Sequence, residues 1–164
     1  MVIHGTELET RCLKGIGAII APVAGGTPNA GEDFTFDIVS HELGLGPRLC
    51  AGRLSCAFRE GALLKMERHL RTPELITAQR GEALVCLAPP QEAVDGAMSD
   101  IVAVLVRAGE SVLIDAGSWH WIPYPLAREG ALFTVVFRDR TGEEDLEIRE
   151  LRDARRLEWQ GRLL

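Results

Sequence analysis

Short apolar runs alternate with turn residues along most of the chain, and this pattern predicts a protein built mainly from β-strands. Turns such as Arg80-Gly81-Glu82 and Ala108-Gly109-Glu110 place a glycine between two apolar runs, where a tight hairpin needs a positive φ. Regularly spaced short strands with such turns are typical of a β-sandwich or barrel. The predicted strands are Gly15–Ala21, Phe34–Val39, Arg53–Phe58, Leu63–His69, Glu74–Ala78, Ala83–Ala88, Ile101–Arg107, Ser111–Asp115 and Leu132–Arg138.

The segment Arg59–Arg71 supports two readings. Its Ala, Leu, Lys, Met, Glu and Arg residues favour a helix by intrinsic propensity. In a strand, Leu63, Glu67 and His69 would share one face, because successive side chains alternate. In a helix, Glu67 and His69 would point to nearly opposite sides and could not share a site. We adopt the strand as the prediction, with Leu63, Glu67 and His69 facing inward together.

The C-terminal stretch, residues 146–164, has a different pattern. Leu151, Ala154, Leu157 and Leu164 fall near helical spacing among several arginines. We therefore predict a C-terminal helix over residues 146–164, packed on the rest of a single domain that spans residues 1–164.

Charge and composition exclude several classes of protein. The chain has 164 residues, with 18 basic and 24 acidic side chains and a formal charge of −6, which argues against a nucleic-acid-binding protein. No apolar run approaches the roughly 20 residues that span a bilayer, so no membrane association is expected. The N-terminus lacks the pattern of a signal peptide, and the four cysteines show no C-x-x-C pairing. We therefore expect a cytoplasmic protein with reduced thiols.

Two sets of spacings resemble the two motifs of the cupin superfamily. The residues that carry the resemblance are Gly61, Glu67, His69, Glu74 and Gly81 in the first motif, and Gly109, Asp115, Gly117 and His120 in the second. The chain departs from the family twice, since Glu67 stands in place of the first histidine and Asp115 in place of a proline. The resemblance implies a mainly β, cupin-type jelly-roll barrel.

Such a fold would bring four metal-ligating side chains together. Glu67, His69, Glu74 and His120 supply two imidazoles and two carboxylates, a set that suits a divalent ion such as Mn, Fe, Ni, Co or Zn. The alternative is that each histidine is an ordinary structural residue, and only the joint spacing favours a shared site.

A closer resemblance is to the ureidoglycolate lyase family. It is carried by the segments Met66–His69, Gly81–Val85, Gly109–Val112, Trp119–His120 and Phe133–Arg140. The chain departs from that family at Leu70 and Trp121, which stand where it has proline and histidine, and at Glu74, where a glutamine is expected. The resemblance implies cleavage of ureidoglycolate to glyoxylate and urea, and a homodimer.

The resemblance also implies roles for individual residues. Glu74 is the candidate base and His120 the second candidate catalytic residue. Arg138 is a candidate for binding the substrate carboxylate, although a surface ion pair would also explain it. Trp121 and Tyr124 are candidates for the mouth of the pocket, as is Trp119, for which core packing is the alternative. Lys65 shares the face of Glu67 and His69 if that segment is a strand, and could bind a substrate carboxylate, with a position at the barrel rim as the alternative. The implied substrate is a small carboxylic acid.

Three other functions or folds remain open at this stage. The first is a cupin that binds a small molecule without turning it over. The second is a metal-dependent cupin enzyme that acts on another small carboxylic acid. The third is a helical protein in which the motif spacing is a coincidence.

Overall fold

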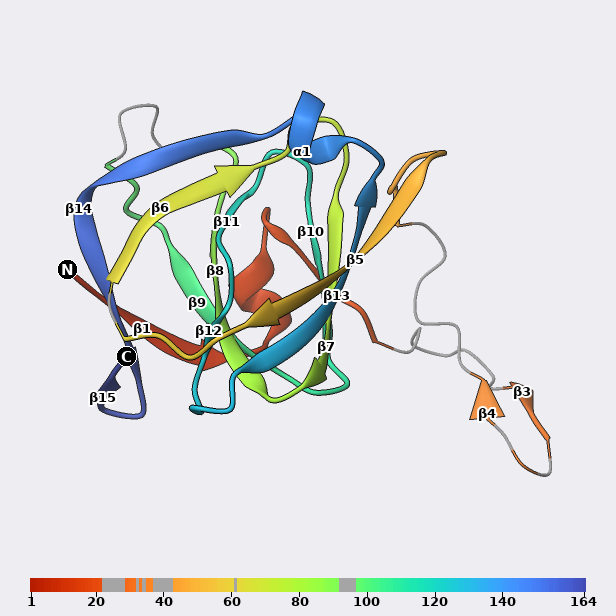
Figure 1. The fold of residues 1–164 in the computed structure, drawn as a ribbon, viewed down its shortest axis with the longest axis horizontal. Coiled ribbons are helices and arrows are strands. Elements are labelled where there is room, and N and C mark those ends of the chain that lie inside the picture. The colour runs from red at the N-terminus through yellow and green to blue at the C-terminus, as the bar shows by residue number, and fades with distance from the viewer. Residues whose placement is uncertain (22–28, 32, 34, 37–42, 61, 92–96) are drawn as a thin grey trace.

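A computed structural model describes residues 1–21, 29–31, 33, 35–36, 43–60, 62–91 and 97–164. Most strands belong to two large sheets (Figure 1). The first sheet contains β1 (Val2–Glu7), β6 (Ala62–Arg68), β8 (Glu82–Ala88), β9 (Val102–Arg107), β11 (Trp119–His120), β12 (Tyr124–Pro125), β14 (Glu147–Trp159) and β15 (Arg162–Leu163). The second contains β2 (Gly17–Ile19), β5 (Leu49–Cys56), β7 (Glu74–Arg80), β10 (Ser111–Ile114) and β13 (Ala131–Arg138). Strands β3 (Asn29–Ala30) and β4 (Thr35–Phe36) form a separate hairpin, and the described helices are η1 (Thr10–Leu13) and α1 (Thr141–Glu144).

The first sheet closes on itself into a ring. Strand β1 pairs in parallel with β9 through Gly5–Glu7 and with β14 through Val2–His4, and the order β1-β9-β8-β11-β6-β14 thereby returns to β1. Figure 1 shows β1 and β14 meeting near the two chain termini. Closure pairs strand edges that would otherwise be exposed. Leu63, Met66, Trp119, Leu151 and Leu157 from the ring strands pack together in the first hydrophobic core.

The second sheet stacks on the other face of β8 and β9. Ala83, Val85 and Leu87 pack against residues of β7, β10 and β13 in the second core, whereas Leu84 and Cys86 belong to the first. Residues 83–88 are all buried because β8 has a core on both faces. This explains why the strand reads as an unbroken apolar run and not as an alternating one.

The predicted β architecture is confirmed, and Arg59–Arg71 forms a strand in spite of its helical propensity. Residues 62–68 are strand β6, which pairs with β11 and β14. Tertiary pairing therefore overrides the intrinsic preference of this segment. The predicted strand over 34–39 is described only at Thr35–Phe36, and Gly61 of the first motif lies outside the described residues.

The predicted helix over residues 146–164 is wrong. Residues 147–159 form the long strand β14, which pairs with β6 on one side and with β1 on the other, and the nearby helix α1 ends at Glu144. The buried residues Leu151, Arg155 and Leu157 are separated by even intervals, which is the period of a strand. Leu151 and Leu157 fit a helical spacing only together with Ala154. The structure shows that Ala154 is exposed, so it does not belong to the apolar face.

The predicted shared face of Leu63, Glu67 and His69 is only partly correct. The register between β6 and β14 shifts between Lys65 and Leu63, and Leu64 between them is 58% exposed. An irregularity of this kind reverses the alternation of side chains. Leu63 therefore packs with Met66 in the first core, and Glu67 and His69 line a cavity instead.

Closure of the ring by β14 leads to a prediction for stability. We expect Leu157→Ala to lower the free energy of unfolding by about 2–5 kcal/mol, because the side chain is fully buried in the first core. Leu163→Ala, at a position 48% exposed on β15, is the matched control and should change it by less than about 0.5 kcal/mol. Urea denaturation measures both values, and equal losses would contradict the closed ring.

Among the residues that the structure describes, no helix has the length and apolar character needed to cross a membrane.

Candidate metal centre

Strands β6 and β11 place three polar side chains at one end of the space between the two sheets. Glu67 lies near the end of β6, and His69 follows two residues later. His120 on β11 is paired directly opposite Glu67. Alternate residues of a strand, and residues directly opposite on neighbouring strands, project to the same face. Glu67, His69 and His120 therefore share one face, as the strand reading of residues 63–69 predicted.

The turn before β11 holds His120 beside the end of β6. Gly117 in this turn has φ +84°, and its amide donates a hydrogen bond to the carbonyl oxygen of His69 at 2.6 Å. A residue with a Cβ would be strained at this φ and would approach Pro90 to 3.4 Å. The glycine of the second motif thus supports a close contact between the two histidine-bearing segments.

Glu74 brings a second carboxylate from the opposite sheet. It is the first residue of β7, and its Oε2 lies 3.4 Å from His69 Nε2, with Oε1 3.8 Å from His120 Nε2. Glu67 Oε1 lies 3.9 Å from His120 Nε2, and the two imidazole centroids are 5.0 Å apart. The four side chains predicted as metal ligands therefore do converge.

Both imidazoles are oriented by backbone carbonyls. His69 Nδ1 lies 3.2 Å from the carbonyl oxygen of Asp145, and His120 Nδ1 lies 3.2 Å from that of Ser118. A carbonyl only accepts hydrogen bonds, so each Nδ1 carries the proton and each neutral ring keeps a free lone pair on Nε2. An imidazole whose Nδ1 proton is held by a backbone carbonyl is typical of histidines that bind metals through Nε2.

The charges of the site are coupled when no ion is bound. Burial alone would lower the pKa of His69, but the hydrogen bond and the negative charge of Glu74 outweigh it and raise that pKa above its usual value. Burial would raise the pKa of Glu74, but its contacts with His69 and His120 lower it. A protonated His69 thus compensates the buried Glu74 carboxylate in the ion-free protein.

The donor set fits a divalent transition metal. Glu67, His69 and His120 can each place one ligand atom within 4.8 Å of the other two. His120 Nε2 is buried and has no hydrogen-bond partner, which is a cost that a bound cation would remove. Two imidazoles with carboxylates suit Mn, Fe, Co, Ni or Zn.

The four groups lie at the polar end of a cavity of about 350 Å³. Side chains from both sheets form its walls: Leu54, Ile76, Val85, Ile114, Val135 and Phe137. Apolar walls lower the local dielectric constant, so electrostatic interactions beside them are stronger than in solution.

Of the four residues predicted to bind substrate, only Trp121 is among the residues that line this cavity. Lys65 Nζ lies 5.0 Å from the centre of the Trp121 ring and does not reach the cavity wall. Tyr124 is buried in the first core, where its hydroxyl donates to the carbonyl oxygen of Ala62. Arg138 forms an ion pair with Glu144, at 3.1 Å. The structure therefore does not bring Lys65, Tyr124 and Arg138 to the described cavity, because strand register determines where each side chain lies.

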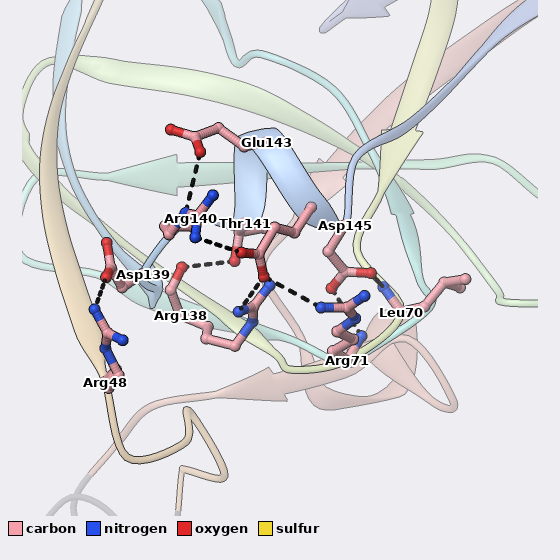
Figure 2. A network of polar contacts seen from close by, with 10 residues as sticks. Arg48, Leu70, Arg71, Arg138, Asp139, Arg140, Thr141, Glu143 and Asp145 are labelled. Carbon is pink, nitrogen blue, oxygen red and sulfur yellow. Dashed lines mark hydrogen bonds and ion pairs between the residues drawn. The ribbon is translucent and has the colours of Figure 1, made fainter.

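Sequence reasoning missed the segment that supports His69 from the far end of the chain. Thr141, Gly142 and Leu146 line the cavity, and Asp145 between them orients His69. Ion pairs from Arg71, Arg138 and Arg140 to Glu144 hold this segment. Figure 2 shows the three arginines around it. Asp145 is 76 residues from His69, and no sequence motif connects them.

Comparisons with known proteins identify the fold but no family. No protein-family model matches the chain, and no curated protein matches it. Among solved structures, a TDP-fucose-3,4-ketoisomerase from Campylobacter jejuni is 7% identical, with a TM-score of 0.53 over 80% of this chain and 87% of that one.

Two weaker structural matches are a dTDP-6-deoxy-D-glucose-3,5-epimerase and an 11S globulin. The epimerase, from Legionella pneumophila, is 15% identical, with a TM-score of 0.49 over 88% of this chain and 74% of that one. The 11S globulin procruciferin from Brassica napus is 18% identical, with a TM-score of 0.42 over 63% of this chain and 22% of that one. At 7% identity the ketoisomerase match shows the fold alone, and it agrees with a cupin-like jelly-roll barrel. The two weaker matches add nothing to this conclusion.

Proposed function

We propose that this chain is a metal-dependent enzyme of the cupin fold that acts on a small molecule bound between its two sheets. One observation carries the proposal: His69 and His120 hold their Nδ1 protons on backbone carbonyls, and their Nε2 atoms face two carboxylates beside an apolar cavity. Glu67, His69 and His120 would hold the ion, with Glu74 as a fourth ligand or as a neighbouring base. A bound divalent ion would act as a Lewis acid on an oxygen of the substrate.

The chain's own residues supply the remaining chemistry. Glu74 is ionised, because its contacts with the two histidines lower the pKa of its carboxyl group, and it can accept a proton from a substrate hydroxyl. The apolar walls keep water from competing for that proton. Trp121 and Ile122, which follow His120 directly, form part of the wall beside the polar end.

Ureidoglycolate is the first substrate to test, because the sequence resemblance to ureidoglycolate lyases includes Glu67, His69 and His120. Its cleavage requires a base that takes the hydroxyl proton and an acid that protonates the departing urea nitrogen. Glu74 is the candidate base and, once it holds the hydroxyl proton, also the candidate acid. His120, the second catalytic candidate from the resemblance, would act as a metal ligand, because its Nδ1 proton is held by the carbonyl oxygen of Ser118 and its Nε2 would bind the ion. The side chain expected to bind the carboxylate, Arg138, is paired with Glu144 instead. Binding of that carboxylate would therefore depend on the metal.

A nucleotide-linked sugar, such as the substrate that the name of the ketoisomerase indicates, fits this cavity poorly. A diphosphate is usually bound by arginine or lysine side chains. Arg53 is the one such residue among those that line the described cavity. Arg53 lies on β5 opposite Thr134 and is exposed. Its two neighbours in the chain, Gly52 and Leu54, face inward. Its side chain therefore projects from the outer face of the sheet.

The experiment that tests the proposal measures metal content and turnover together. We expect purified protein, after incubation with Mn, Fe, Co, Ni or Zn and gel filtration, to retain one ion per chain. Urea release from ureidoglycolate, and turnover of other small carboxylic acids, should require that ion and stop after chelation. Protein that retains no ion from any of the five would overturn the proposal, whereas metal binding without urea release would exclude only ureidoglycolate.

Metal binding should weaken as the pH falls from about 7 to 5. Both histidines must be neutral to bind the ion, so protons compete with it. The raised pKa of His69 makes that competition begin at a higher pH than for free imidazole. The fold should persist over this range. His69, whose pKa is raised in the folded protein, stabilises the fold most at pH values below the pKa of an unfolded histidine. Glu74, whose pKa is lowered, stabilises the fold most at pH values above the pKa of an unfolded glutamate.

Metal content and circular dichroism on one pH titration check this expectation. Glu67→Gln keeps the shape of the side chain but removes a charged ligand, so its ion should be lost at a higher pH than in the wild type. An ion content that stays constant down to pH 5 would contradict ligation by these two histidines.

A further inference from the structure

The cavity separates its polar groups from its apolar walls. Glu67, His69, Glu74 and His120 cluster at one end, and the walls beyond them come from Ile76, Val85, Ile114, Val135 and Phe137. Thr141, which also lines this space, already donates its hydroxyl to the carbonyl oxygen of Arg138 at 2.6 Å. A ligand would therefore find its polar partners at one end only.

The described walls offer no positive charge to a second anionic group. The side chain of Arg53 projects from the outer face of the sheet. Arg138 is not among the residues that line the cavity: its Nη1 is paired with Glu144, and its Nε and Nη2 are buried without a hydrogen-bond partner. The guanidinium of Arg59 donates to the carbonyl oxygens of Ile122 and Pro123, at 2.7 and 2.9 Å, and thereby holds the wall instead of facing a ligand. Burying an unpaired charge against apolar walls is costly.

The apolar lining continues to the exposed rim. Ile122 and Leu146 line the cavity and are 39% and 41% exposed. Both would be covered by a ligand whose body extends outward from the metal centre, and covering apolar surface is favourable.

The size of the cavity limits the ligand. Its volume is about 350 Å³, near the lower end of the range for small-molecule sites. A cavity of this volume suits a small molecule.

We propose that the substrate class is a small acid or hydroxy acid with one metal-chelating end and an apolar, aliphatic or aromatic body. The chelating end lies at Glu67, His69 and His120, and the body lies against Ile76, Val85 and Phe137 and extends toward Ile122 and Leu146. This inference rests on the proposed metal-dependent function and narrows its substrate. A molecule that is polar along its whole length, such as ureidoglycolate, leaves these walls without a matching surface.

A series of hydroxamates with a constant chelating head tests the substrate class by binding and not by turnover. Isothermal titration calorimetry with the metal-loaded protein would compare acetohydroxamate, butyrohydroxamate, pentanohydroxamate and benzohydroxamate. Succinic monohydroxamate is the matched polar probe, because a carboxylate replaces the apolar end of pentanohydroxamate. We expect affinity to rise about fourfold for each added methylene, and succinic monohydroxamate to bind at least about tenfold more weakly than pentanohydroxamate.

A rim variant locates the effect in this cavity. Leu146→Ser should lower the affinity for the hydroxamates with longer tails by about threefold or more. It should leave the affinity for acetohydroxamate, which has the shortest tail, nearly unchanged. Leu163→Ser, at an equally exposed leucine on β15 that does not line this cavity, is the matched control and should bind the whole series as the wild type does.

The outcomes distinguish the two proposals. If acetohydroxamate binds but affinity is independent of tail length, or succinic monohydroxamate binds as tightly as pentanohydroxamate, the apolar substrate class is wrong and the metal centre stands. If acetohydroxamate itself does not bind the metal-loaded protein, the metal-dependent function fails, and the substrate class that rests on it fails as well.

Discussion

Replacing His120 with alanine should abolish stoichiometric metal binding. His120 supplies one of the two imidazoles, and its Nε2 is buried without a hydrogen-bond partner in the ion-free protein. Loss of that ligand leaves Glu67 and His69 on one strand and Glu74 on another, with no donor from β11. We expect the metal affinity to fall by at least about a hundredfold, a larger effect than the 10–100-fold typical of outer-shell changes.

Metal content after gel filtration measures the effect, and circular dichroism checks the fold. The barrel should persist, because the alanine only enlarges a cavity that is already present. His4→Ala is the matched control: His4 carries an imidazole whose side chain is 70% exposed and is bonded to Glu158, so its loss should leave metal binding unchanged. A His120→Ala protein that keeps one tightly bound ion would show that the metal lies elsewhere. His69→Ala should behave as His120→Ala does.

The convergence at this site could be predicted from the sequence because it depends on local geometry. Glu67 and His69 share a face as soon as their segment is a strand, and the spacing to His120 matched a known pair of motifs. The strand itself was the uncertain step, since its composition favours a helix. Pairing with β11 and β14, which a single sequence does not display, decided it.

Other features depended on register, which sequence patterns specify poorly. Leu63 leaves the face of Glu67 because the pairing with β14 shifts beside Leu64. The alternation of side chains along β13 also places Arg138. Val135 and Phe137 face the cavity, so Arg138, the next residue, points to the other face and pairs with Glu144. The sequence pattern of β14 predicts a helix because one of its buried positions is an arginine. Leu151, Arg155 and Leu157 are buried at the even spacing of a strand, but only two of the three are apolar. A charged residue at a core position conceals an alternating pattern.

Asp145 should prove to be a positioning residue for the metal centre, although its carboxylate does not point at the ion. Its carbonyl oxygen accepts the hydrogen bond from His69 Nδ1. Its carboxylate accepts hydrogen bonds from the backbone amides of Leu70 and Arg71, at 3.1 and 2.9 Å (Figure 2). The same residue thus fixes both the imidazole and the turn that follows it. In Asp145→Ala the carbonyl remains but the turn loses its two acceptors, so the imidazole is less well oriented.

We expect Asp145→Ala to weaken metal binding by about 10–100-fold, the range for second-shell partners of a ligating histidine. The d–d absorption of the Co²⁺-loaded protein would report the coordination geometry directly, and a change in its band positions is not expected from a general loss of stability. Asp145→Asn retains an acceptor oxygen and should recover part of the affinity. The matched control is Asp139→Ala, because Asp139 forms its ion pair with Arg48 and touches neither histidine. If Asp145→Ala and Asp139→Ala bind Co²⁺ equally well and with identical spectra, the backbone carbonyl alone orients His69 and the carboxylate has no part in the site.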